Sequence, residues 1–495
     1  MDKDVRVIPI NQKADDDPAN PLRALADFLL LAVCLIFLFR LFVAEPFEVP
    51  TSSMEPTLLG RHQTACCPHC GFEVTFPFPH PSHGKDQTYC QNCQQAIPIP
   101  TNPPTGGDRV VVAKMNADAL KRFDVVVFKS PEEASVPYVK RLIGLPGETI
   151  RIREGEIEVE SEPGKSFHIC RKPPHLVLAM AQPIYDDRFR SASTPVHWKS
   201  NEPEGWRYVN HGYEACGNDP VSLTYQYRIT DVSMAVPIES AVSMAAPIES
   251  SDAAAKTIDS SALVAASAQN IFPARFANDV DDLLLDVTII PSPECHTVSL
   301  QLQSRRGPAE FRWNVDQQTF ALSQAGKALW QGKLARPANE AKLRFANVDQ
   351  SLFLWNGDAL LASVPYECDS SDVARVDRSL SPVVICVSGK GTRVTDLVLR
   401  RDIYYRRSSR AIDWMSEPSH APGDPLISGG ASSQQSAEWT LGKDEYFVLG
   451  DNSADSNDSR HWRQGPALPE RLVLGRVIWN LGSGDLDHFG LMEPR

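Results

Sequence analysis

The sequence has no run of basic residues, and its acidic residues outnumber its basic ones to give a formal net charge of −13. This balance argues against a nucleic-acid partner, because phosphate backbones are bound through clustered lysine and arginine. Cysteine is scarce and odd in number, with eleven residues, which excludes a complete set of paired disulfides. The chain has 495 residues, of which 42% are hydrophobic, enough for two to four folded domains.

One long apolar run stands out near the start of the chain, with twelve consecutive apolar residues at 28–39. A helix over residues 22–44 would be about 34 Å long, against about 30 Å of bilayer hydrocarbon, and we predict a transmembrane helix at residues 21–44. A buried core helix would need a polar face, which this run lacks. A cleaved secretory signal would need small residues at a cleavage site, and Ala44-Glu45-Pro46 is a poor one.

The flanking charges predict the orientation of this helix. Lys13 and Arg23 precede it, and by the positive-inside rule they place the N-terminus in the cytoplasm. Residues 1–20 are polar and acidic, and we expect them to form a disordered cytoplasmic tail. The predicted location is therefore the cytoplasmic (inner) cell membrane, with a single pass through the lipid bilayer and the rest of the chain extracytoplasmic.

A serine-rich stretch, residues 49–58, follows the predicted helix. Pro50 and Pro56 bracket Ser53, so this serine lies in a stiff extended or turn segment where a helix cannot form. A hydroxyl held rigidly beside a membrane is a candidate nucleophile. The alternative is an ordinary serine-rich turn.

Three further segments occur in a fixed order with this one: 107–112, 138–148 and 449–460. Together with Ser53-Met54-Glu55-Pro56-Thr57 they resemble the ordered sequence boxes of type I signal peptidases. The resemblance covers roughly residues 22–160 and 438–482. It implies a mainly β catalytic domain in two parts, 45–160 and 438–495, that removes signal peptides from exported preproteins.

The resemblance also implies the site residues, and no cofactor for catalysis. Ser53 would be the nucleophile and Lys140 its base, which requires the amine to be desolvated because a free lysine is protonated at neutral pH. The Thr51 hydroxyl would help to hold the oxyanion, and Ser456 would orient the amine. Asp458 and Arg460 would form an ion pair that braces the last box. Arg141 would have a structural role. The chain departs from the common pattern at Thr51, Ser52 and Glu148, where serine, glycine and aspartate are usual.

Between the first two boxes lies an insertion, residues 62–105, with two Cys-x-x-Cys pairs. Cys67 and Cys70 are separated by nineteen residues from Cys90 and Cys93. This spacing predicts a zinc-ribbon-like unit in which four thiolates hold a structural zinc ion. The alternative is a pair of disulfides, which an extracytoplasmic location would favour.

The rest of the chain separates the two catalytic parts. We interpret residues 161–270 as irregular linker, because periodicity is weak and a tandem repeat occupies 232–250. Evenly spaced β-branched runs predict an inserted, jelly-roll-like β-sandwich at 271–406, with a possible carbohydrate or protein partner. Residues 407–437 read as a return linker.

Two rival functions fit parts of this pattern. A self-cleaving repressor-type protein also uses a serine and a lysine, but the chain has no DNA-binding helix pair. A catalytically idle membrane adaptor would use the zinc ribbon and the sandwich to bind partners, although the serine and lysine boxes are intact.

Overall fold

A computed structural model of the chain describes residues 21–79, 87–114, 120–133, 135–162, 164–191, 196–231, 236–237, 278–367, 381–407, 438–483 and 490–491. Residues 1–20, the return linker from 408 onward and nearly all of the tandem repeat lie outside this part, so the predictions made for them stay predictions. Within it the fold is mainly β, as the sequence indicated.

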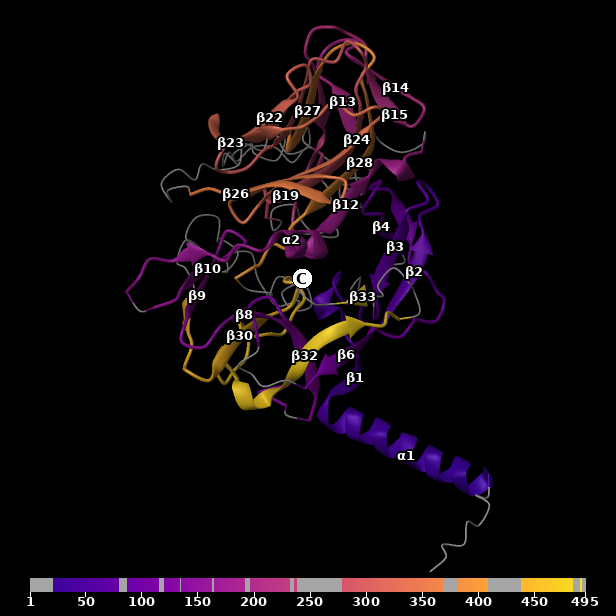
Figure 1. Cartoon of the computed structure of the whole chain (residues 1–495), viewed down its shortest axis with the longest axis vertical. Helices are drawn as coiled ribbons and strands as arrows, with labels where there is room; N and C mark the ends of the chain where they lie inside the picture. The colour runs from indigo at the N-terminus through magenta and orange to yellow at the C-terminus, as the bar shows by residue number, and fades with distance from the viewer. Residues whose placement is uncertain are drawn as a thin grey trace, which may run out of the picture.

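The catalytic region is built on an eight-stranded antiparallel sheet with the order β1-β6-β32-β7-β8-β30-β31, to which β33 adds by pairing with β32. Strands from the two ends of the chain lie side by side in this sheet, with β32 between β6 and β7 and β30 next to β8 (Figure 1). The two parts predicted for the catalytic domain therefore both contribute strands to this sheet. Its strands are β1 (Ala44–Glu48), β6 (Arg109–Ala113), β7 (Val125–Lys129), β8 (Pro137–Gly144), β30 (Glu445–Leu449), β31 (Leu468–Pro469), β32 (Val473–Asn480) and β33 (Gly490–Leu491).

A second, four-stranded sheet has the order β11-β10-β9-β29. The predicted hairpin at 150–159 forms its centre, where Ile157 lies opposite Ile152. The last strand, β29, follows the sandwich in sequence and pairs with β9, so this sheet contains strands from both parts of the catalytic region. Its strands are β9 (Thr149–Arg153), β10 (Glu156–Glu160), β11 (His168–Ile169) and β29 (Glu438–Thr440).

The cysteine-rich insertion consists of two small hairpins, with one Cys-x-x-Cys pair directly after β2 and the other directly after β4. In Figure 1 it lies beside both the catalytic sheet and the sandwich. Its strands are β2 (His62–Cys66), β3 (Glu73–Pro77), β4 (Gln87–Tyr89) and β5 (Ala96–Pro98).

The predicted sandwich is present as two antiparallel sheets that share one core. One sheet has the order β14-β15-β28-β19-β24-β25-β26, with β12 also pairing β28, and the other has the order β13-β16-β27-β20-β21-β22-β23. Side chains from both sheets, such as Leu285 and Phe345 from one and Phe311 and Ile385 from the other, pack into the same buried cluster. The strands within 271–406 are β19 (Leu283–Ile290), β20 (Thr297–Leu302), β21 (Ala309–Asn314), β22 (Thr319–Gln324), β23 (Lys327–Lys333), β24 (Ala341–Val348), β25 (Ser351–Asn356), β26 (Ala359–Pro365), β27 (Val383–Ser388) and β28 (Arg393–Arg401).

The interpretation of residues 161–270 as linker is wrong for its first half. Five strands between residues 182 and 225 join the two sandwich sheets, and three of them, β12, β15 and β16, pair with β28 or β27 more than 160 residues later in the chain. Their partners are too distant to be inferred from local periodicity. The strands are β12 (Gln182–Asp186), β13 (Trp198–Ser200), β14 (Trp206–Val209), β15 (Gly212–Ala215) and β16 (Val221–Tyr225), followed by the small hairpin β17 (Tyr227–Arg228) and β18 (Val236–Pro237).

A short helix, α2 (Pro174–Met180), packs between the sandwich and the catalytic region (Figure 1). Its Val177 belongs to a cluster with Trp355 of the sandwich, and its Met180 to a cluster with Ile150 of the four-stranded sheet. The sandwich is therefore attached to the catalytic region through an apolar contact.

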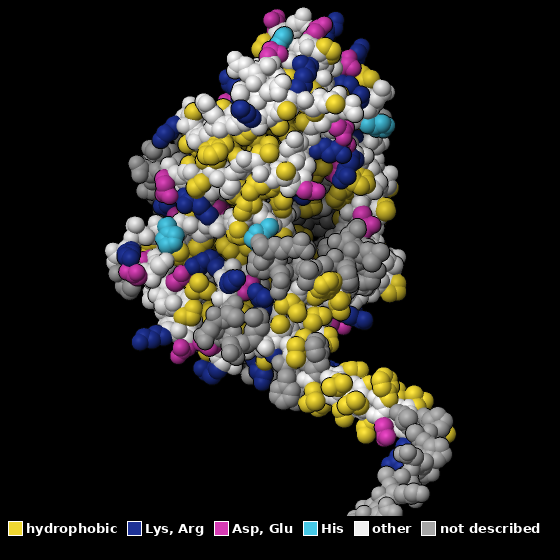
Figure 2. All heavy atoms as spheres, in the orientation of Figure 1, with side chains coloured by type: hydrophobic (Ala, Val, Ile, Leu, Met, Phe, Trp, Pro, Cys, Tyr) yellow, Lys and Arg dark blue, Asp and Glu magenta, His cyan; other side chains and the backbone are white. Residues whose placement is uncertain are grey.

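The predicted N-terminal helix forms as α1 (Pro21–Phe42), and β1 follows it almost directly. Its apolar side chains are exposed, with Phe28 at 65% and Ile36 at 68%, and they cover the face seen in Figure 2. Three charged residues, Arg23, Asp27 and Arg40, fall within its 22 residues. Over the described part of the chain, no helix is long and apolar enough to cross a membrane. The predicted transmembrane span is therefore not confirmed.

Candidate active site

The Ser53 hydroxyl is placed by a short turn of 3-10 helix, Ser52–Met54, which is anchored in the core of the catalytic sheet. Met54 and Leu58 are fully buried there among valines of β6 and β7. Gly60 allows the turn to close, because a Cβ at this position would clash with the Thr51 backbone. Ser53 itself is 8% exposed. Ser53 therefore lies in a turn that is anchored by buried side chains on both sides.

Lys140 reaches Ser53 from β8, the neighbouring part of the sheet. Its Nζ donates a hydrogen bond of 2.5 Å to Ser53 Oγ and one of 3.1 Å to the carbonyl of Val139. The residue is 4% exposed, and its amine forms no ion pair with the residues that the structure describes. Burial lowers the pKa of Lys140 to about 8, although the charges of Asp458 and Asp451 oppose this shift.

The groups predicted to hold an oxyanion lie beside Ser53 Oγ. Thr51 Oγ1 is 3.3 Å from Ser53 Oγ, and it makes no capping bond to the short helix that follows. The backbone N–H of Ser53 lies in the first turn of that helix, where N–H groups have no partner within the helix. The structure therefore brings the Thr51 hydroxyl to the nucleophile, as its predicted role requires.

Ser456 is brought to the site, but not into the predicted contact. Its hydroxyl is buried and makes no hydrogen bond of ordinary geometry, while the Lys140 amine donates to Ser53 and Val139 instead. Ser456 lies against Gly450 and approaches Asp458, whose pKa it helps to lower. The orienting role proposed for Ser456 is therefore not seen in this arrangement.

Arg141, the residue after the lysine, points to the other side of β8. Its Nε donates to Asp451 Oδ1 at 2.7 Å and its Nη2 to Oδ2 at 2.5 Å, a bidentate pair in which the side chains are 3% and 0% exposed. Asp451 also accepts a hydrogen bond from Thr57 at 2.5 Å. This pair links the lysine box, the serine box and the last box. The sequence analysis gave Asp451 no role. An acidic residue in one box and a basic residue in another could have indicated an ion pair between the boxes.

Asp458 and Arg460 form the predicted ion pair. The two side chains are fully buried, with Nε–Oδ1 and Nη2–Oδ2 distances of 2.8 and 2.7 Å. Asp458 Oδ2 also accepts the backbone N–H of Gly450 at 3.0 Å. The neighbouring Arg460 charge and these hydrogen bonds outweigh burial and lower the pKa of Asp458. The pair fixes the loop at 450–460.

This loop is bonded directly to the serine turn by Asn452. Its backbone N–H donates to the carbonyl of Ser53 at 3.1 Å, and its side-chain amide donates to the carbonyl of Ser52 at 3.2 Å. Sequence reasoning gave Asn452 no role. The backbone of the nucleophile is thus held by the last box as well as by its own core contacts.

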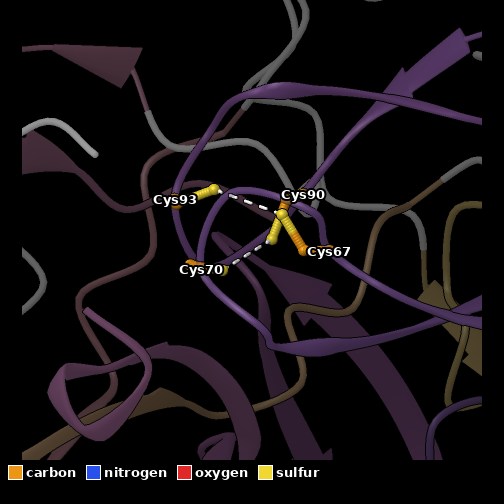
Figure 3. Close-up of side chains that lie close together, drawn as sticks. All are labelled: Cys67, Cys70, Cys90 and Cys93. Atoms are coloured by element: carbon orange, nitrogen blue, oxygen red, sulfur yellow. Dashed lines mark hydrogen bonds between the residues drawn. The ribbon is translucent and has the colours of Figure 1, made fainter. Parts of the chain in front are cut away.

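The four cysteines of the insertion converge at one point (Figure 3). Their sulfur atoms all lie within 4.8 Å of one another, with Cys67–Cys93 at 3.6 Å and Cys70–Cys90 at 3.7 Å. None of the four forms a disulfide in this structure. A tetrahedral zinc ion with Zn–S bonds of about 2.3 Å would separate sulfurs by about 3.8 Å, which matches these distances.

Known proteins share parts of this chain. The family model described as "Signal peptidase, peptidase S26" matches residues 22–66, 100–192 and 408–481. Signal peptidase I of Rickettsia massiliae is 28% identical over 133 residues, which are 27% of this chain and 41% of that protein. Signal peptidase I of Buchnera aphidicola is 32% identical over 116 residues, which are 23% of this chain and 27% of that protein. The match thus spans less than half the length of these relatives.

Among solved structures, a carbohydrate binding module from Bacillus subtilis is 7% identical, with coverage of 41% of this chain and 96% of that one and a TM-score of 0.25. A Bacillus subtilis protein with a galectin-like fold is 8% identical, with coverage of 45% and 98% and a TM-score of 0.28. The boxes, their convergence on Ser53 and the matched family model show that these segments of the chain are similar to the signal peptidases of peptidase family S26.

Proposed function

We propose that the chain is a membrane-bound serine endopeptidase that removes N-terminal signal peptides from exported preproteins with Ser53 and Lys140. The observation that carries this proposal is the hydrogen bond of 2.5 Å between the Lys140 amine and the Ser53 hydroxyl in a buried setting. A lysine amine that is buried without a carboxylate partner loses its proton more easily, which is what a general base requires.

The reaction follows from this pair. Ser53 Oγ attacks the carbonyl carbon of the scissile bond while its proton passes to neutral Lys140 Nζ. The oxyanion forms beside the Thr51 hydroxyl and the Ser53 N–H, which stabilise its charge. Lys140 then protonates the leaving amine and the peptide bond breaks, leaving an acyl ester on Ser53. A water molecule, deprotonated by Lys140, hydrolyses this ester and Ser53 Oγ regains its proton.

The position of α1 supports a site close to a lipid bilayer. Its exposed apolar side chains favour attachment to lipid, and Ser53 follows its last residue, Phe42, by eleven residues. A signal peptide presents its scissile bond near the membrane, next to an apolar segment. The single pass with a cytoplasmic N-terminus stays a prediction, as does a carbohydrate or protein partner for the sandwich.

We also propose that the cysteine cluster holds a structural zinc ion. The sulfur separations of 3.6 and 3.7 Å fit a tetrahedral site, and four thiolates would leave zinc no open position for catalysis. Cys67, Cys70, Cys90 and Cys93 would be its ligands. The ion would hold the two hairpins of the insertion together.

The cleavage reaction is tested on a purified preprotein whose signal ends in Ala-x-Ala. We expect the full chain, in detergent or lipid, to cut once after this sequence, and N-terminal sequencing of the product identifies the bond. A matched substrate with phenylalanine at the residue before the bond should resist, because secretory signals carry small residues before the cut. Absence of cleavage by the wild-type chain in lipid would contradict the proposal and would favour the adaptor function.

The pH dependence of cleavage tests the state of the lysine. With a pKa of about 8, only about a tenth of Lys140 is neutral at pH 7, so kcat should rise with pH and reach half its maximum near pH 8. A half-maximum near pH 10 would show that the amine is wetted and would contradict its role.

A second group near the site titrates in the same range, because burial raises the pKa of Glu55 to about 8. The variant Glu55→Gln removes this titration. We expect the half-maximum of its profile to stay near pH 8, which assigns the rise in rate to Lys140. A shift of the half-maximum in Glu55→Gln would assign the rise to the carboxyl group.

A further inference from the structure

The inserted sandwich touches the active-site loop where its last strand ends. Residues 402–406, which we call the exit segment, follow β28 and pass the loop at 450–460. Within this segment the backbone N–H of Arg406 donates to Ser453 Oγ at 2.8 Å, and its carbonyl accepts from Arg460 Nη1 at 2.6 Å. Two main-chain groups of the sandwich exit are thus bonded to the loop that holds Ser53.

The side chain of Arg406 is fixed in the opposite direction, to the sandwich. Its Nε and Nη2 donate to the two carboxylate oxygens of Asp231 at 2.7 and 2.9 Å. The Asp231 side chain is 1% exposed, and its carboxylate also accepts from the backbone and the side-chain amide of Asn278 at 2.9 and 2.7 Å. A bidentate pair of this kind restricts the arginine to one geometry. Asp231 therefore sets where the Arg406 backbone lies.

The contact continues from Ser453 to the nucleophile. Ser453 Oγ accepts from Arg460 Nη1 at 2.9 Å, and Arg460 in turn pairs with Asp458. The preceding residue, Asn452, donates to the carbonyls of Ser52 and Ser53. Hydrogen bonds therefore run without a break from Asp231 through Arg406 to the loop that positions Ser53.

We propose that Arg406 and Asp231 are positioning residues for the proposed peptidase site, so that the inserted sandwich forms part of the support of the nucleophile. Both residues fall outside the segments matched by the family model. The support is therefore a feature of this chain's insertion. The proposal rests on the proposed function of Ser53 and Lys140.

The test compares two acid-to-amide variants in the sandwich. Asp231→Asn weakens the bond to Arg406, whereas Asp286→Asn weakens ion pairs to Arg344 and Arg400 that remain within the sandwich. We expect kcat of Asp231→Asn to fall about tenfold with KM nearly unchanged, because a small misplacement of the nucleophile slows the chemical step. The kcat of Asp286→Asn should stay within about twofold of wild type, even where its loss of thermal stability is similar.

A second comparison distinguishes position from stability. Arg406→Lys keeps the charge but not the bidentate geometry, and it should retain more kcat than Arg406→Met. If Asp231→Asn does not fold, the comparison of Arg406→Lys with Arg406→Met tests the positioning role instead. Equal kcat in wild type and Asp231→Asn, or equal losses in Asp231→Asn and Asp286→Asn, would overturn the positioning role.

The control for the proposed function itself is separate. Wild type must cleave the preprotein faster than Ser53→Ala, and if both cut equally the proposed peptidase site fails. If wild type alone cuts and Asp231→Asn matches it, only the positioning role fails.

Discussion

Replacement of Lys140 by methionine should reduce kcat for preprotein cleavage by at least about a thousandfold, because loss of one member of a nucleophile–base pair removes most of the catalysis. Methionine fills the space of the side chain without an amine to accept the Ser53 proton. The same variant should unfold at an equal or higher temperature. Burial lowers the pKa of Lys140 from 10.5 to about 8, which corresponds to a cost to folding of about 3 kcal/mol at pH 7.

The sign of this stability change follows from linkage. The folded amine has the lower pKa, so the unfolded chain binds more protons between about pH 8 and pH 10.5, and the cost is present in full below pH 8. Raising the pH through this range relieves the cost. A gain in stability from Lys140→Met should therefore be largest below pH 8 and disappear above pH 10.5.

Two further variants complete the test of Lys140. Ser53→Ala should lose activity to the same degree, since the two residues act as a unit and their effects do not add. Lys129→Met is the matched control, because Lys129 is an exposed lysine on the adjacent strand β7 and should keep full activity. Cleavage by Lys140→Met at more than about a tenth of the wild-type rate would remove the base from the mechanism.

A second buried lysine shows why burial alone does not identify a lysine that can act as a base. Lys172 is as buried as Lys140, but its amine contacts Asp349 at 2.8 Å and Asp402 at 2.7 Å. These two carboxylates outweigh desolvation and raise the pKa of Lys172 well above its usual value. The sequence offers no sign of this difference. Before the structure, only the resemblance of the box around Lys140 to a known family indicated that Lys140, and not Lys172, is the candidate base.

The catalytic strands could be predicted because their signal is local. Residues 125–128 are apolar and mostly β-branched, and Val139, Leu142 and Ile143 flank the charged pair at 140–141. These segments form β7 and β8, with Lys140 opposite Val126. The prediction that Ser53, Lys140 and the Asp458–Arg460 pair lie together came instead from the resemblance of the ordered boxes to a known family. The order of strands in the sheet was not accessible, because β32 inserts between β6 and β7 from more than 340 residues away.

The contacts that join the domains were missed for a different physical reason. Asp231 and Arg406 are ordinary charged residues in segments without periodicity, and only the folded chain brings them to Ser453. Asn92 is a similar case, since it lies between two cysteines and yet its Oδ1 accepts the backbone N–H of Asp186 in β12 at 2.7 Å. Long-range pairing of this kind leaves no mark in the local sequence.

Removal of metal from the cysteine cluster should lower the unfolding temperature of the protein by at least about 10 °C, because zinc bound only to the folded state contributes its binding free energy to stability. The four thiols converge within 4.8 Å, and without a cation their thiolates would repel one another. We expect one zinc ion per chain by elemental analysis of the purified protein, and its release by a chelator should accompany the loss of stability.

Cys90→Ser should reproduce the effect of the chelator, and Cys66→Ser is the matched control, because Cys66 is exposed and lies outside the cluster, directly before Cys67. Loss of the metal should also reduce cleavage. The reason is that the insertion is connected to the site: it starts at His62, two residues after the Gly60 that packs on Thr51. In addition, Asn92, within the second Cys-x-x-Cys pair, is hydrogen-bonded to the sandwich. The zinc site would be contradicted if the purified wild-type protein contained no metal and thiol titration found four fewer free thiols than the number of cysteines. That result would indicate two disulfides in the cluster. Chelation would then leave both stability and activity unchanged.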